Sequence, residues 1–108
     1  MIIIKTKIHI RTKNLINPRE ILREEFMKPL NISQNALATA IHVPTTRIGE
    51  IVNEKRGITA DTALRLGVFF NTTSEFWMNL QTNYDLQTAL VGKESEINSI
   101  RASSKLVY

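Results

Sequence analysis

Prolines constrain this chain of 108 residues more than any other feature of its sequence. Pro18 suits the first position of a helix, because its ring fixes φ and it leaves no N–H unpaired there. Pro29 and Pro44 instead mark helix ends, since proline lacks the donor that the next helical hydrogen bond requires. Capping side chains and apolar residues at helical spacing lie around these breaks. The sequence therefore predicts a domain of short helices and not a coiled coil.

Caps and apolar spacing together predict five helices. Asn17, Ser33 and Thr59 are good N-caps for the first, second and fourth helices, and Asn71 closes the fourth. With their capping residues, the helices are expected at 17–28, 33–41, 44–53, 59–71 and 73–92. The residues expected to line the inner faces of the first four are Ile21, Leu22, Phe26, Leu37, Ala38, Ile41, Ile48, Ile51, Val52, Ala63, Leu64, Val68 and one of Phe69 or Phe70.

The ends of the chain follow different patterns. Residues 2–11 alternate between apolar and polar, which predicts one β-strand. No pairing partner for it is visible, unless the apolar end 106–108 supplies one. We expect three parts: an N-terminal extended segment 1–16, a helical domain 17–92, and a polar tail 93–108 with weak helical spacing. The tail is expected to be mobile or to depend on a partner.

Charge and composition narrow the possible functions. The net charge is +4, but residues 1–13 carry four basic and no acidic residues, which leaves ten of each in the rest. A nucleic-acid partner of the helical body therefore requires a local arrangement of charges. Cysteine is absent, no apolar run reaches the roughly 18 residues of a membrane span, and no catalytic or cofactor motif appears. We expect a cytoplasmic protein that is not an enzyme and holds no metal or cofactor.

Three stretches of the chain resemble the Xre-type helix-turn-helix family, and in particular its HigA-type antitoxins: NPREILREEFMKPL, SQNALATAIHVPTTRIGEIVNEKRGITADTALRL and TSEFWMNLQTNYDL. The resemblance covers residues 17–90 and implies an all-α, five-helix domain like that of lambda repressor. It also implies a dimer that binds operator DNA, neutralises a HigB-type ribonuclease toxin and represses the operon encoding both. A repressor of the same family without a toxin, and a pure protein-interaction module, remain alternatives.

The helix expected at 44–53 has a polar face suited to a DNA major groove. Thr46, Glu50 and Asn53 lie opposite its apolar stripe, with Arg47 on one flank. Threonines can contact thymine methyls, arginine can reach guanine or phosphate, and glutamate can accept from a cytosine amino group. Gln34 matches a family position that touches the DNA backbone. The candidate DNA-binding residues are Gln34, Thr45, Thr46, Arg47, Glu50, Asn53, Lys55 and Arg56.

The same residues have simpler explanations. The two threonines also suit the start of a helix, and the basic side chains are also typical of a solvated surface.

Two half-sites about 34 Å apart on DNA require a dimer. The helix at 73–92 has more apolar residues than a core of this size encloses, so Phe76, Leu80 and Tyr84 are the candidate dimer residues.

Three residues depart from the family pattern. His42 occupies a turn position that is glycine in most members, so we expect a positive φ and some strain there. Glu54 replaces the glycine that follows the third helix, so this helix must end in another way. Gly49 lies inside that helix, at a cost of about 1 kcal/mol relative to alanine.

Overall fold

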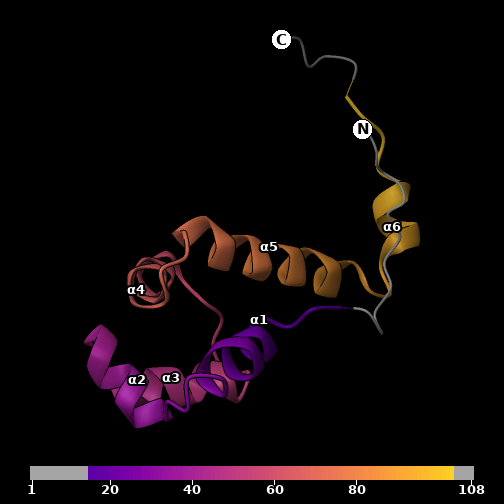
Figure 1. The fold of residues 1–108 in the computed structure, drawn as a ribbon. Coiled ribbons are helices and arrows are strands. Elements are labelled where there is room, and N and C mark those ends of the chain that lie inside the picture. Colours follow the sequence, from indigo (N-terminus) through magenta and orange to yellow (C-terminus); the bar gives the residue numbers. More distant parts are fainter. Residues whose placement is uncertain (1–14, 104–108) are drawn as a thin grey trace. The chain divides into compact units, whose positions relative to one another are not determined.

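The computed structural model describes residues 15–103, and within this range it is helical without a strand (Figure 1). The elements are α1 (Pro18–Glu20), η3 (Ile21–Met27), α2 (Gln34–Ile41), α3 (Thr45–Val52), α4 (Ala60–Phe70), α5 (Ser74–Leu90) and α6 (Glu94–Asn98). The mostly helical fold is confirmed, with the bounds of the five predicted helices correct to within a few residues. The predicted number is wrong, because α6 forms a further helix in the segment expected to be a tail. The strand predicted at 2–11 lies outside the described residues.

The first helix changes its hydrogen bonding along its length. Asn17 caps α1 by accepting from the backbone N–H of Arg19 (3.0 Å), as its residue type predicts. The helix then continues as the π-helix η3, in which Lys28 N–H donates five residues back to the Arg23 carbonyl (2.9 Å). Pro29 follows directly and has no N–H to extend the ladder. The helix therefore ends at Met27, where the proline predicted its end.

Four helices end in the same way, with a residue other than glycine in the left-handed backbone conformation. Asn31, His42, Glu54 and Asn71 all have positive φ, between 52° and 63°. After each, an N–H donates to the carbonyl five residues earlier, which closes the end of the helix. These bonds are Ile32 to Met27 (3.0 Å), Val43 to Ala38 (3.0 Å), Lys55 to Glu50 (2.7 Å) and Thr72 to Gly67 (2.9 Å). The positive φ expected at His42 is confirmed, and Glu54 itself takes the place of the missing glycine.

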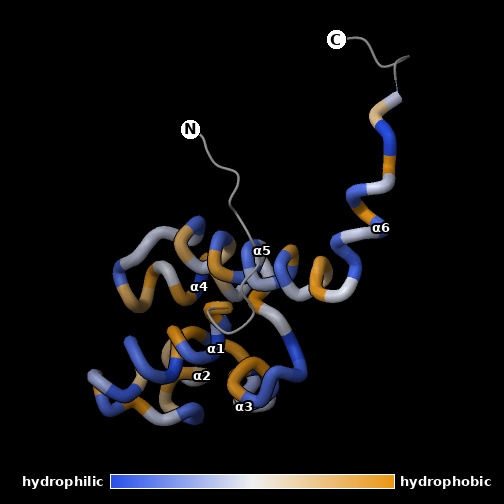
Figure 2. Tube along the Cα trace, turned by 90° about the vertical axis from the view of Figure 1, so that its right-hand side faces the viewer, coloured by the Kyte–Doolittle hydropathy of each residue, from blue (hydrophilic) through white to orange (hydrophobic). Residues whose placement is uncertain are grey.

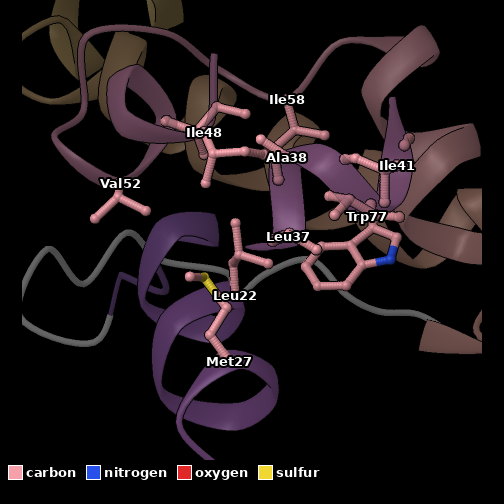
Figure 3. Close-up of a cluster of buried hydrophobic side chains, with 12 residues drawn as sticks. Leu22, Met27, Leu37, Ala38, Ile41, Ile48, Val52, Ile58 and Trp77 are labelled. Atoms are coloured by element: carbon pink, nitrogen blue, oxygen red, sulfur yellow. The ribbon is translucent and has the colours of Figure 1, made fainter. Parts of the chain in front are cut away.

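The core joins the first helix to α2, α3, α4 and α5. Figure 3 shows the buried side chains gathered around Leu22 and Leu37, with the Trp77 indole beside them. Trp77 is fully buried and its Nε1–H donates to the Thr72 hydroxyl (2.8 Å). Phe26 extends the cluster, since its ring centroid lies 5.0 Å from that of Trp77. The inner residues predicted for α2 and α3 are all buried.

The face of α4 that packs inward differs in part from the prediction: Ala63 is buried as predicted, but two other residues are not. Leu64 and Val68 are 58% and 85% exposed, whereas Leu66 and Gly67 are buried. The cause is a close approach of backbone: a Cβ on Gly67 would lie 3.1 Å from the carbonyl oxygen of Thr72. Only the glycine side of α4 allows this contact, so the helix turns that side inward. The prediction that Leu64 and Val68 lie in the core is wrong.

The chain divides into a compact unit, residues 16–84, and a second unit that contains its remaining residues. In the described part of the second unit, α5 runs to Leu90, Gly92 has a φ of 79°, and α6 follows. Residues 91–103 are exposed, including Ile97 and Ile100. None of the helices described between residues 15 and 103 has the length and apolar character needed to cross a membrane.

Candidate nucleic-acid interface

A helix, a tight turn and a second helix form the centre of the compact unit. Ser33 caps α2 by accepting from Ala36 N–H (3.0 Å), and α2 ends at His42. Pro44 is extended and α3 begins at Thr45 without a side-chain cap. The turn between α2 and α3 therefore comprises 42–44. It is too short to let the helices separate, which fixes α3 against α2.

The N-terminus of α3 is tied to that of α2 by a side-chain hydrogen bond. The Thr45 hydroxyl donates to Asn35 Oδ1 (2.7 Å), so its oxygen does not cap α3. Thr45 is nevertheless the first residue of α3, so its simpler explanation as a residue that starts a helix remains open beside its role as a DNA-binding candidate. Gln34 lies nearby, since a Cβ built on Gly49 would be 3.4 Å from its Oε1 atom. The first turn of α2 and the middle of α3 thus share one surface.

The outward face of α3 is polar and accessible. Its apolar residues Ile48, Ile51 and Val52 are buried, and the predicted DNA-binding residues lie on the other sides of the helix or just beyond it. Thr45, Thr46, Asn53, Lys55 and Arg56 are exposed, while Gln34, Arg47 and Glu50 are half-buried. The loop at 53–56 is hydrophilic throughout (Figure 2). No described part of the compact unit covers the face that a DNA groove would meet.

Both charged residues on this face are held by a partner of opposite charge. Arg47 Nη1 donates to Asp61 Oδ2 (2.8 Å), and Arg56 Nε donates to Glu50 Oε1 (2.9 Å). The second pair matters for Glu50, because a carboxylate that stands alone is repelled by phosphates, and this one has a donor close by. The face therefore presents paired charges together with uncharged threonine, glutamine and asparagine side chains.

Asp61 also receives a hydrogen bond from Arg65 Nε (2.9 Å). This bond is the main cause that lowers the pKa of the Asp61 carboxyl; partial desolvation opposes it, and Arg47 adds to the lowering. Arg65 Nη1 in turn donates to the backbone oxygens of Ile41 (2.9 Å) and His42 (3.3 Å). A cation at the carbonyl end of α2 is favourable, since those carbonyls carry the negative end of the helix dipole.

The end of α3 is secured from the first helix. Glu54 accepts a hydrogen bond from Arg19, which also approaches the Val52 carbonyl (3.4 Å). This ion pair accompanies the strained backbone at Glu54, where φ is 63°. Lys55 and Arg56 leave the helix directly after it, on the exposed loop. The two phosphate candidates therefore follow a fixed helix end.

Three residues of this surface escaped the sequence analysis: Asn35, Asp61 and Arg65. Asp61 and Arg65 are four residues apart on a predicted helix, so their mutual pairing had a sequence signal. Their contacts with Arg47 and with the turn had none, because those residues are distant in sequence. Among residues 15–103 no three acidic or histidine side chains lie close enough together to hold a metal ion.

The predicted dimer residues lie on α5. Leu80 and Tyr84 are half-buried, and Leu80 packs against the core. Phe76 is 36% exposed and its ring stacks edge-on against Trp77, with centroids 5.0 Å apart. Each of these three side chains is therefore already partly covered by its own chain, and only the remaining exposed part is available to a second copy.

Comparison with known proteins agrees with this geometry. The sequence model of the helix-turn-helix family matches residues 24–77, which include α2, the turn and α3. Over 80 residues the chain is 56% identical to "Virulence-associated protein I" of Dichelobacter nodosus, covering 74% of each protein.

Two solved structures share both fold and sequence. "Pseudomonas aeruginosa antitoxin HigA with higBA promoter" is 45% identical with a TM-score of 0.77, covering 86% of this chain and all of that one. "Antitoxin GraA in complex with its operator" is 47% identical with a TM-score of 0.75, covering 86% and 92% of the two chains. The resemblance to HigA-type antitoxins is thereby confirmed, and the chain belongs to the Xre-type helix-turn-helix family.

Proposed function

We propose that this protein is the antitoxin of a toxin–antitoxin pair. In this proposal it binds operator DNA as a homodimer through α3, represses its own operon and neutralises a HigB-type ribonuclease toxin. The observation that carries the proposal is the accessible polar face of α3, in a chain 45–47% identical to two antitoxins solved with promoter or operator DNA.

The chemistry of the face fits a major groove. Thr46 offers a methyl group for thymine and a hydroxyl for hydrogen bonding, and it is exposed in the first turn of α3. Arg47 keeps N–H donors beyond the one that Asp61 accepts, and these suit guanine or phosphate. Lys55 and Arg56 suit phosphate, as does Gln34 in the first turn of α2. The phosphate contacts would position α3, and the α3 contacts would read bases.

Glu50 takes a specific role in this proposal. Its pairing with Arg56 brings a cation and an anion side by side at the end of the reading face. On the correct sequence, the carboxylate accepts from a cytosine amino group and the guanidinium turns to a phosphate. A base that presents an acceptor there, such as thymine through O4 or guanine through O6, is repelled by the carboxylate. Glu50 would therefore discriminate between sequences more than it strengthens binding.

The DNA-binding part is tested by gel shifts on the DNA upstream of the gene. Wild-type protein should bind an inverted repeat, and its affinity should fall with salt by a log–log slope of about −0.9 for each phosphate neutralised. Thr46→Ala with Arg47→Ala should reduce the preference for that site. The matched control is Thr82→Ala with Arg101→Ala, which removes the same two side-chain types at exposed positions elsewhere. Equal binding by both double variants would contradict the role of α3.

The toxin-binding part is tested by co-expression with the neighbouring gene. Purification through a tag on this chain should retain a small basic protein, and that protein should inhibit growth when produced alone. Recovery of this chain by itself, together with operator binding, would favour a repressor that has no toxin.

A further inference from the structure

Asp61 connects the proposed reading helix to the rest of the domain. It is the second residue of α4, and its Oδ2 atom accepts from both Arg47 Nη1 (2.8 Å) and Arg65 Nε (2.9 Å). One carboxylate oxygen thus lies between an arginine of α3 and an arginine of α4. The three side chains together carry one net positive charge, so the cluster still attracts a polyanion.

The carboxylate is itself anchored from behind. Arg65 donates through Nη1 to the carbonyl oxygens of Ile41 (2.9 Å) and His42 (3.3 Å), at the turn that joins α2 to α3. Its Nε donates to Asp61, and the separation of four residues on α4 suits this contact. A continuous series of hydrogen bonds therefore runs from the turn through Arg65 and Asp61 to Arg47.

This anchoring limits the freedom of Arg47. Its side chain is 28% exposed, compared with 44% for Arg56, which lies in the loop that follows α3 and pairs with Glu50. One N–H of the Arg47 guanidinium points to Asp61, and its remaining donors are available to a ligand. A long side chain held in this way has less conformational entropy to lose when it binds.

We propose that Asp61 is a positioning residue for DNA recognition, which holds the Arg47 guanidinium in place for the operator. The inference rests on the proposed DNA-binding function. A carboxylate near a duplex repels phosphate, so Asp61 cannot increase affinity for DNA in general. Its benefit appears only where the geometry of Arg47 matters, at the base or phosphate that Arg47 contacts on the correct sequence. Asp61 therefore contributes to the specificity ratio and not to bulk attraction.

The test compares operator DNA with scrambled DNA of the same length at one salt concentration. Asp61→Ala should lower the ratio of the two affinities by about 3- to 10-fold, the effect of ordering one long side chain on binding. Its affinity for scrambled DNA should stay the same or rise. The control is Glu75→Ala, which removes a carboxylate from the same helical position of α5, where it accepts from the adjacent Ser74 (3.3 Å). This control should leave the ratio unchanged.

A double-variant cycle separates positioning from a structural role. In an Arg47→Ala background, Asp61→Ala should have no further effect on the ratio, because the side chain that it positions is gone. Thermal unfolding identifies the fraction folded, and Asp61→Asn replaces Asp61→Ala if the latter unfolds at the assay temperature. The inference would be overturned if Asp61→Ala left the ratio of operator to scrambled affinity unchanged or raised it. It would also be overturned if Asp61→Ala lowered this ratio equally in the wild-type and Arg47→Ala backgrounds. Absence of operator preference in the wild type would instead overturn the proposed function itself.

Discussion

Two glycines inside helices make a matched test of how backbone packing sets stability. Gly67 in α4 lies under the turn to α5: a Cβ there would be 3.1 Å from the Thr72 carbonyl oxygen and 3.2 Å from the Ser74 nitrogen. Gly49 in α3 meets only the flexible end of the Gln34 side chain, at 3.4 Å. Alanine at either position gains the same helical preference, so the two substitutions differ only in what the new methyl group meets.

The two substitutions should change the free energy of unfolding in opposite directions. Replacing a mid-helix glycine by alanine stabilises by about 1 kcal/mol. At position 49 the side chain of Gln34 can move aside at little cost, so Gly49→Ala should raise the free energy of unfolding by about 0.5–1 kcal/mol. At position 67 the contact is with backbone, and overpacking of this kind costs about 1–3 kcal/mol. Gly67→Ala should therefore lower the free energy of unfolding by about 1 kcal/mol.

Urea titration followed by circular dichroism measures both variants against the wild type. The two unfolding free energies should differ by about 2 kcal/mol, and the melting temperatures should lie on either side of the wild-type value by several degrees. A Gly67→Ala variant as stable as Gly49→Ala would show that the turn yields easily. Contact between the Thr72 backbone and Gly67 would then not determine which side of α4 faces inward.

Three further predictions concern the core, the turn and the charge cluster. Thr72→Val leaves the buried Trp77 N–H without its acceptor (2.8 Å in the wild type) and should lower the free energy of unfolding by about 1–3 kcal/mol in urea titrations. His42→Gly removes the strain of a non-glycine residue at φ 63° and should raise the melting temperature. The glycine also increases the entropy of the unfolded chain, so the net increase in the free energy of unfolding is at most about 1 kcal/mol. A lower melting temperature would contradict the presence of strain at His42. The hydrogen bond from Arg65, the largest cause, lowers the pKa of Asp61 below its ordinary 3.8 in the folded state. The ionised Asp61 carboxylate therefore stabilises the folded state fully above pH 3.8, and this stabilisation is lost as the pH falls through the lower folded pKa. The free energy of unfolding should consequently depend less on pH in this acid range for Asp61→Asn than for the wild type.

Local signals in the sequence predicted the helices and their order. Asn17, Ser33 and Thr59 cap helices where their side-chain chemistry suggested, and Pro29 and Pro44 mark the breaks. These signals act between residues a few positions apart, so they can be interpreted without knowledge of the fold. The apolar stripe of α3 was equally clear, because its polar and apolar residues separate cleanly around the helix.

Tertiary structure decided what the local pattern left ambiguous. Apolar residues surround much of α4, so its sequence did not specify an inner face; the close approach of the Thr72 backbone to Gly67 did, and Leu64 and Val68 were left exposed. The pairing of Arg47 with Asp61 joins residues 14 positions apart on different helices. The sequence by itself thus determined which segments are helical and which residues α3 presents. The fold alone determined which charges meet there, since these contacts depend on the distances between helices and not on the order of residues within them.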